Sequence, residues 1–250
     1  MSEDQAYFKI SVPSLTKTSA FLPSFGALFC ILYSVIFDFE HSTATHCKVP
    51  NFLPTISAAI GEKPQIYVWR ICICLHSTPR ILMALSYYRF HTNVHVGKHQ
   101  QLYTILAASC SFLHICENFA LIVLTYVSSS ENYGIHEKAF ILFMVFSMVY
   151  MCLTCMLFGW GRTANGRHMT VTERRSYHYK ISLFVMNVSC AMLAVYLFLR
   201  HNTYCEPGVH AGFAAYDYFT IFTHIAFSLT AILDFDDLQL SLKNSPKKSN

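Results

Sequence analysis

Charged side chains are scarce in this sequence. Asp, Glu, Lys and Arg make up 13% of the 250 residues, about half of the ~25% that is usual in soluble globular domains. Glycine and proline are also few, at 9 and 8 residues, which excludes collagen-like chains and glycine- or proline-rich disordered chains. Most of the 18 basic residues are scattered over loops, whereas nucleic-acid binding requires a concentrated basic face. These absences leave an integral membrane protein as the expected class.

Long apolar runs take up much of the chain. Hydrophobic residues account for 54% of the sequence, and its mean hydropathy is +0.37. A membrane-spanning helix needs about 20 mostly apolar residues, and the alternation typical of transmembrane β-strands does not occur. We therefore predict an all-α polytopic membrane protein with a cytosolic N-terminal segment at 1–19, one transmembrane domain at 20–235 and a cytosolic tail at 236–250. The six predicted spans are residues 20–37, 66–88, 102–127, 139–160, 181–199 and 211–233.

The basic residues indicate which side of the membrane each loop faces. With six spans both termini share one side, which holds twelve of the 18 Lys and Arg residues, whereas the opposite side holds four. Because cytosolic loops are enriched in Lys and Arg, we predict that both termini are cytosolic. Loops 41–65, 128–138 and 200–209 then face the lumen or the exterior. The ending 247–250 (KKSN) resembles a cytosolic dilysine retrieval signal, and a merely basic tail near anionic lipid is the alternative.

Cysteine positions agree with this orientation. Of the ten cysteines, all but Cys47 and Cys205 lie within predicted spans. Both exceptions lie in loops assigned to the oxidising side, where disulfides form and persist. A disulfide between Cys47 and Cys205 is therefore a candidate. No set of Cys and His residues has the spacing of a zinc site, so no metal is expected.

Ionisable residues are concentrated in three of the six predicted spans. A charge within a bilayer costs about 2.5–3.5 kcal/mol on insertion scales, so it needs a function or a partner. The second, third and sixth spans contain these residues: Arg70, His76 and Arg80; His114 and Glu117, with the polar Asn118 beside them; Asp217 and His224. Two interpretations stay open. The residues form internal ion pairs that hold three helices together, or they line a polar cavity that opens toward the lumen.

The residue types suit the binding of a phospholipid headgroup. Arginine can bind two phosphate oxygens at once through its planar guanidinium, and a histidine beside a carboxylate can act as a general base toward a lipid hydroxyl. The sequence has no nucleotide-binding loop, serine-hydrolase elbow or metalloprotease helix. From the residues alone we expect a polytopic protein that handles a lipid or another solute at a luminal polar site.

Five segments carry a family resemblance: HCKVPNFLPTISAAIG at 46–61, YVWRICICLHSTPR at 67–80, ENFALIVLTYVSSSE at 117–131, IHE at 135–137 and RHNTYCE at 200–206. They resemble the post-GPI-attachment-to-proteins factor 2 family, multispan proteins of GPI-anchor lipid remodelling. The resemblance implies a Golgi membrane protein, cycling with the endoplasmic reticulum, that restores a saturated, stearoyl-type chain at the sn-2 position of a lyso-GPI. It implies no bound cofactor, with acyl-CoA or a phospholipid as the acyl donor. The implied partners are GPI-anchored proteins, lyso-GPI, membrane lipids and other GPI-remodelling enzymes, and no nucleic acid.

The resemblance and the polar residues combine in one mechanistic hypothesis. His76 or His136 is the general base, oriented by Glu117 or Glu137, and Arg70 and Arg80 bind the phosphate of the headgroup or acyl donor. The candidate catalytic residues are His76, Glu117 and His136. The candidate substrate- and phosphate-binding residues are Arg70, Arg80, Asn118, Asp217 and His201. The alternative is a non-catalytic lipid-binding or scaffold protein that presents lyso-GPI to a separate acyltransferase.

Overall fold

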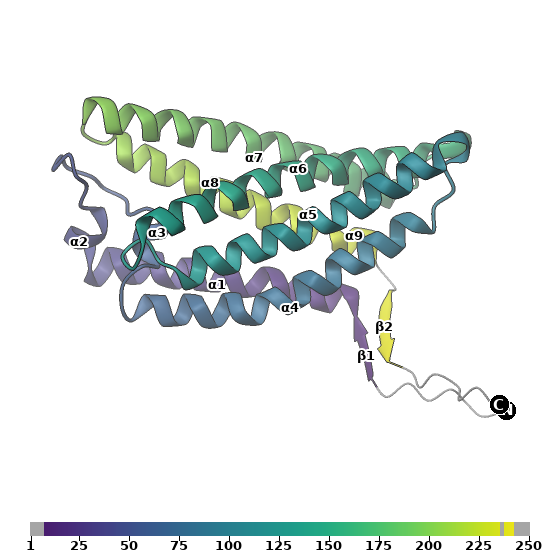
Figure 1. The fold of residues 1–250 in the computed structure, drawn as a ribbon, viewed down its shortest axis with the longest axis horizontal. Coiled ribbons are helices and arrows are strands. Elements are labelled where there is room, and N and C mark those ends of the chain that lie inside the picture. Colours follow the sequence, from purple (N-terminus) through teal and green to yellow (C-terminus); the bar gives the residue numbers. More distant parts are fainter. Residues whose placement is uncertain (1–7, 236–237, 243–250) are drawn as a thin grey trace.

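Long helices dominate the computed structural model, which describes residues 8–235 and 238–242 (Figure 1). The long helices are α1 (Val12–Phe37), α4 (Gln65–Thr92), α5 (Gln100–Tyr126), α6 (Tyr133–Thr163), α7 (Val171–Tyr204) and α8 (Val209–Leu229). Shorter elements are α2 (Phe39–Thr43), α3 (Ile56–Ala59), α9 (Ala231–Asp234) and the 3₁₀ turns η1 (Gly97–His99) and η2 (Ala164–Gly166). The dilysine-like ending and most of the predicted tail lie outside the described residues.

The long helices form a closed ring whose order follows the chain. α1 packs on α4, α4 on α5, α5 on α6, α6 on α7 and α7 on α8, and α8 returns to α1. Successive long helices run in opposite directions along the bundle, and α2 and α3 lie together at one end of it, here called the α3 end (Figure 1). The three helices whose predicted spans carry ionisable residues, α4, α5 and α8, therefore contribute to one shared ring interior.

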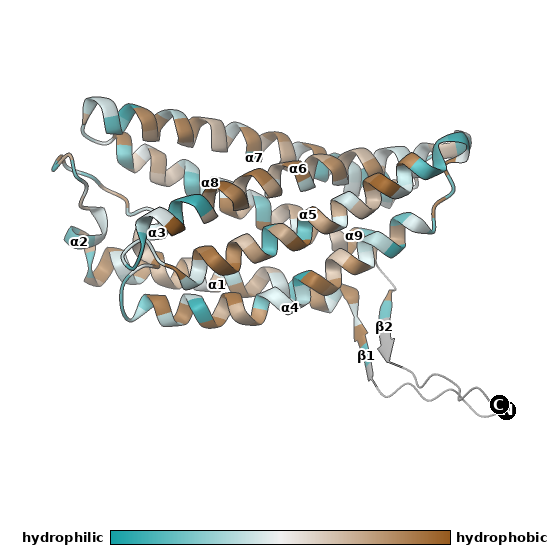
Figure 2. Cartoon of the chain, viewed as in Figure 1, coloured by the Kyte–Doolittle hydropathy of each residue, from teal (hydrophilic) through white to brown (hydrophobic). Residues whose placement is uncertain are grey.

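Hydrophobic residues predominate along the long helices (Figure 2), and many of them face outward. Large hydrophobic side chains such as Phe21, Leu32, Ile141 and Met192 are exposed, which is typical of contact with lipid rather than water. The helical segments long and apolar enough to cross a membrane are Val12–Phe37, Gln65–Thr92, Gly97–Tyr126, Tyr133–Gly166 and Val171–Tyr204. The chain is therefore an all-α, multi-pass membrane protein. A sixth crossing, by the 21-residue α8, stays a prediction.

Several helices extend beyond the predicted apolar spans. α7 begins at Val171, because Thr170 and Glu173 form a capping box that satisfies the first backbone N–H groups. Its 34 residues measure about 51 Å at ~1.5 Å per residue, more than the ~30 Å hydrocarbon core of a bilayer. α1 likewise begins at Val12 and has Pro13 in its first turn. Proline has no backbone N–H, but the N–H groups of the first turn have no partner within the helix, so no hydrogen bond is lost there. Hydropathy marks the lipid-embedded part of a helix, whereas capping residues mark its ends.

A short antiparallel strand pair joins the two ends of the described chain. β1 (Phe8–Ser11) pairs with β2 (Gln239–Leu242), with Phe8 opposite Leu242 and Ser11 opposite Gln239. The sequence analysis did not anticipate these strands, because four residues are too few for a clear alternating pattern. The pairing places both ends of the described chain at the end of the bundle opposite α3, here called the strand end (Figure 1).

Candidate functional site

The ring interior contains a buried ion-pair cluster from three helices. Arg80 Nη2 on α4 donates to Glu117 Oε2 on α5 at 2.6 Å, and His224 Nε2 on α8 lies 2.8 Å from Glu117 Oε1. Glu117 is fully buried, and the other two side chains are nearly so. The His224 contact lacks hydrogen-bond alignment, and it is an ion pair when the imidazole is protonated. Breaking a buried pair by removing one partner typically costs about 3–5 kcal/mol, so this cluster holds α4, α5 and α8 in register.

His76 lies one turn before Arg80 on the same face of α4. Its Nδ1 is 2.5 Å from the backbone oxygen of Ser19 on α1 and 3.2 Å from the Ser19 hydroxyl. Because a carbonyl oxygen only accepts hydrogen bonds, this contact assigns the proton to Nδ1 and leaves Nε2 as an acceptor. His76 therefore has the arrangement of a general base whose ring is held by a backbone carbonyl. The predicted orienting residue, Glu117, contacts Arg80 and His224 instead.

A cavity of about 60 Å³ lies beside the cluster. Its polar wall consists of His76, Arg80, Asp217 and His224, and the rest is mostly hydrophobic side chains of α1, α3, α4, α5, α6 and α8. Sites for small molecules usually measure about 300–1,000 Å³, so the cavity as it stands has room for a few water molecules. It must enlarge to admit a lipid. Ionisable groups that converge in an apolar chamber suit a molecule with a polar head and a hydrocarbon chain.

The short helix α3 closes the cavity toward the α3 end. Ile56 and Ser57 belong to the cavity wall, and the Ser57 hydroxyl lies 3.0 Å from His136 Nε2 on α6. The other ring nitrogen of His136, Nδ1, is 2.8 Å from the backbone oxygen of Val127. The predicted catalytic residue His136 thus lies behind α3 and links it to α6, and its side chain does not line the cavity.

Arg70 lies apart from the cluster, at the α3 end of α4. Its guanidinium donates to the backbone oxygens of Thr125 and Tyr126 and to Glu131 Oε2 at 2.5 Å. The backbone N–H of Ser128, together with the Arg70 guanidinium, holds the pKa of the Glu131 carboxyl below its usual value. Arg70 therefore ties down the loop between α5 and α6 and does not join the other predicted phosphate-binding residues at the cavity.

Asn118 and Asp217 occupy different surroundings. Asn118 Nδ2 donates to the backbone oxygen of Ser77 at 3.2 Å, with the side chain 1% exposed, so it fastens α5 to α4. Asp217 is buried at the cavity wall. Its neighbour Tyr218 donates to the backbone oxygen of Pro54, so α8 also holds the segment that leads into α3.

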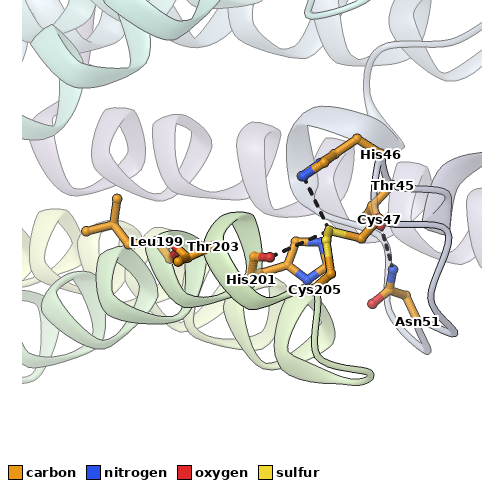
Figure 3. Close-up of a disulfide and its surroundings, with 8 residues drawn as sticks. All are labelled: Thr45, His46, Cys47, Asn51, Leu199, His201, Thr203 and Cys205. Atoms are coloured by element: carbon orange, nitrogen blue, oxygen red, sulfur yellow. Dashed lines mark hydrogen bonds between the residues drawn. A yellow bond between two sulfur atoms is a disulfide. The ribbon is translucent and has the colours of Figure 1, made fainter.

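Cys47 and Cys205 form a disulfide with their Cα atoms 5.3 Å apart (Figure 3). The bond joins the loop after α2 to the turn between α7 and α8. His201 lies beside this disulfide and is not part of the cavity wall. The predicted site residues therefore do not share one place. His76, Arg80 and Asp217 line the cavity, whereas Arg70 binds the loop between α5 and α6 and His201 lies beside the disulfide.

His224 is the residue that the sequence analysis placed in a span without assigning it a role. The signal that could have identified it is its distance of seven residues from Asp217, which equals two helical turns and puts both on one face. His114, three residues before Glu117, stacks instead on Tyr150 of α6 with ring centres 4.2 Å apart. Helical spacing from a carboxylate thus shows that a histidine lies on the same helix face. Its role depends on which side chain of a neighbouring helix it contacts.

Comparisons with known proteins agree with the resemblance found in the sequence. The chain matches the family described as Frag1/DRAM/Sfk1/Cwh43P N-terminal domain over residues 13–238. It is 40% identical over 236 residues to a Xenopus tropicalis protein named acyltransferase PGAP2, covering 94% of this chain and 92% of that protein. A Danio rerio protein of the same name is 39% identical over 215 residues, covering 85% of this chain and 90% of the relative.

A Caenorhabditis elegans protein named post-GPI attachment to proteins factor 2 is 38% identical over 228 residues, covering 90% of this chain and 85% of the relative. No solved structure matches the chain. The family match covers the whole helical ring, and the relatives align over most of their own length. The chain therefore belongs to the post-GPI attachment to proteins factor 2 family, which confirms the family predicted from its sequence.

Proposed function

We propose that this protein is an acyltransferase that restores a saturated, stearoyl-type chain at the sn-2 hydroxyl of a lyso-GPI, on the luminal side of a Golgi membrane. The observation that carries the proposal is the convergence of His76, Arg80, Asp217 and His224 on one otherwise apolar, buried cavity. The name acyltransferase, printed for the Xenopus and Danio relatives, supports the reaction class. The partners are GPI-anchored proteins that carry the lyso-GPI and an acyl donor, either acyl-CoA or a phospholipid.

His76 is the general base in this proposal. Its Nε2 accepts the proton of the sn-2 hydroxyl, while Nδ1–H stays on the backbone oxygen of Ser19. The hydroxyl oxygen attacks the acyl carbonyl carbon, a new ester bond forms, and the bond to the leaving thiol or alcohol breaks. The proton then passes from His76 to the leaving group, so the base is restored and no cofactor is consumed.

Arg80 stabilises the negative charge that develops on the acyl carbonyl oxygen. Its Nη2 is held by Glu117, and its Nε has no hydrogen-bond partner among the residues that the structure describes. Burying a donor without a partner lowers the stability of the folded protein. Such a donor is already in position, however, to stabilise negative charge that forms in the transition state. Glu117 and His224 hold Arg80 in place, and Asp217 supplies a second polar group for the headgroup.

The test is acyl transfer by the purified full chain in detergent, with lyso-GPI and a labelled stearoyl donor. His76→Asn is the informative variant, because an asparagine amide can keep the Nδ1 hydrogen bond to Ser19 while the accepting Nε2 is removed. Loss of general-base catalysis typically lowers the rate about 10²–10⁴-fold, so we expect a loss of at least about 100-fold. The matched control is His168→Asn, an exposed histidine in the loop before α7, which should keep the wild-type rate.

Two results would overturn the proposal. His76→Asn with a wild-type rate would place the chemistry elsewhere in the chain. Wild-type protein that binds lyso-GPI but forms no diacyl product with either acyl-CoA or a phospholipid donor would favour the non-catalytic alternative, in which the chain presents lyso-GPI to a separate acyltransferase. The unfolding midpoint of each variant distinguishes lost chemistry from lost folding.

A further inference from the structure

A second cluster of reactive side chains lies at the α3 end, away from the central cavity. The potential ligand atoms of His46, Cys47 and Cys205 all lie within 4.8 Å of one another, and His46 Nε2 is 3.3 Å from Cys47 Sγ. Figure 3 shows His46 and His201 on either side of the disulfide sulfurs. The ring centres of His46 and His201 are 5.7 Å apart. The proposed acyl transfer uses none of these groups.

His201 is the least expected member of this cluster. Its side chain is 1% exposed, and neither ring nitrogen meets a hydrogen-bond partner within the described part of the chain. Burying a polar atom without a partner is unfavourable. The backbone explains its position, because His201 lies in the last turn of α7 and Cys205 follows four residues later as the C-cap. The backbone N–H of Cys205 donates to the backbone oxygen of His201, and Figure 3 shows the His201 imidazole close to the disulfide.

We propose that His46, Cys47, His201 and Cys205 form a zinc site when the disulfide is reduced. Zinc binds four N and S ligands in a tetrahedron, with sulfur at about 2.3 Å and nitrogen at about 2.0–2.1 Å. That geometry puts two thiolates about 3.8 Å apart and two imidazole ring centres about 5 Å apart. The observed separation of the His46 and His201 ring centres, 5.7 Å, is close to the second of these values, whereas the two sulfurs must move apart once their bond is broken and His201 must turn to direct a ring nitrogen at the metal. Two thiolates and two imidazoles are the ligand set of many structural zinc sites.

The disulfide and the zinc site exclude each other chemically. A dithiol reductant converts the bond between the two sulfurs into two thiols and becomes a disulfide itself. Zn²⁺ then displaces one proton from each thiol and binds the two thiolates and the two neutral imidazoles. Sequence spacing does not reveal this site, because its two cysteines are 158 residues apart in the chain. Oxidised and reduced forms would thus fasten the same two loops, by a disulfide or by zinc.

The experiment is a Co²⁺ titration of the purified full chain, before and after reduction with a phosphine. We expect the reduced chain to bind one equivalent of Co²⁺ with a thiolate charge-transfer band and the visible bands of tetrahedral cobalt, and Zn²⁺ to displace it. The oxidised chain should show neither. The double variant Cys47→Ser/Cys205→Ser measures the background from the other cysteines, and the expected signal is the difference between the two proteins.

Histidine variants test the remaining ligands. His46→Ala should weaken cobalt binding by about tenfold or more, and His201→Ala should change the visible bands because water takes its place. His41→Ala is the matched control, since His41 is an exposed histidine in α2 outside the cluster. The proposal is overturned if the reduced wild type shows no signal above the double variant, if the oxidised chain binds cobalt equally well, or if His46→Ala and His41→Ala behave alike.

Discussion

At the scale of single residues, a buried lysine near the strand end is paired with a buried carboxylate. Lys180 on α7 is fully buried, and its Nζ donates to Asp234 Oδ2 at 2.7 Å and to the Ser176 hydroxyl at 2.6 Å. Tyr87 on α4 donates to the same carboxylate oxygen at 2.6 Å, and Ser176 donates to the other at 2.6 Å. A single carboxylate therefore holds α4, α7 and α9 together.

Replacing Asp234 tests this network. Asp234→Asn leaves Lys180 as a buried charge without its counter-ion, and we expect the free energy of unfolding to fall by about 3–5 kcal/mol. The measurement is the unfolding midpoint in detergent. Asp38→Asn is the control, because Asp38 contacts the exposed His41 and surface pairs contribute about 0–1 kcal/mol. The double variant Lys180→Met/Asp234→Asn should recover much of the loss, and a failure of Asp234→Asn to lower the midpoint would contradict the interpretation.

At the scale of elements, α3 is the part of the cavity wall best suited to move. A four-residue helix is not stable by itself, so its position depends on hydrogen bonds from neighbouring side chains. Ser34 donates to Ala59, Ser129 donates to Ser57, and His136 contacts the Ser57 hydroxyl. Each such bond contributes only about 0.5–1.5 kcal/mol net. Because the cavity must enlarge to admit the proposed lipid substrate, we expect α3 to be the part of the wall that moves.

Hydrogen–deuterium exchange can detect this motion. Ser57→Ala removes the contact with His136, so we expect faster exchange in residues 55–61 and a loss of about 1 kcal/mol in stability, with the interior of α5 unchanged. Ser14→Ala, at an exposed position in the first turn of α1, is the control and should change neither quantity. If residues 55–61 exchange as slowly as the α5 interior in wild type and in Ser57→Ala alike, α3 is not a movable cover.

At the scale of the whole molecule, the ring order and the strand pair restrict the topology. β1 and β2 hold both described ends of the chain at the strand end, and the long helices alternate in direction. Among the described residues, five helical segments are long and apolar enough to cross a membrane. With the predicted sixth crossing by α8 the number of crossings becomes even, as the position of both described ends at the strand end requires. With six crossings, the disulfide and α3 lie on the opposite side of the membrane from both described ends, and the predicted orientation makes that side luminal.

Cysteine accessibility tests the predicted orientation. Glu40→Cys in α2 and Arg167→Cys in the loop before α7 both place a thiol at an exposed position. With a membrane-impermeant maleimide, Arg167→Cys should react once only the plasma membrane is permeabilised, whereas Glu40→Cys should react only after the organelle membranes are also opened. Wild-type protein supplies the background from native thiols. Equal reactivity of both variants at the first step would rule out the predicted sidedness.

Composition and local sequence pattern were sufficient to predict that the protein is helical, that it spans a membrane and which family it belongs to. Apolar runs between charged loops indicate membrane helices whatever their neighbours are, and the basic loops supply an orientation. The spacing of His76 and Arg80 likewise indicates a shared helix face, because helical periodicity depends only on positions within one segment. These inferences needed no knowledge of which helix packs against which.

Only the tertiary structure shows which side chain or backbone group each buried polar residue contacts. Arg80 meets Glu117 whereas Arg70 meets Glu131, and a backbone oxygen on α1 determines which nitrogen of His76 is free. These outcomes depend on the order of helices around the ring and on the rotation of each helix about its axis. Both arise from packing among segments far apart in the chain. Local spacing therefore could name the polar residues, but only the packed bundle shows which of them share a cavity.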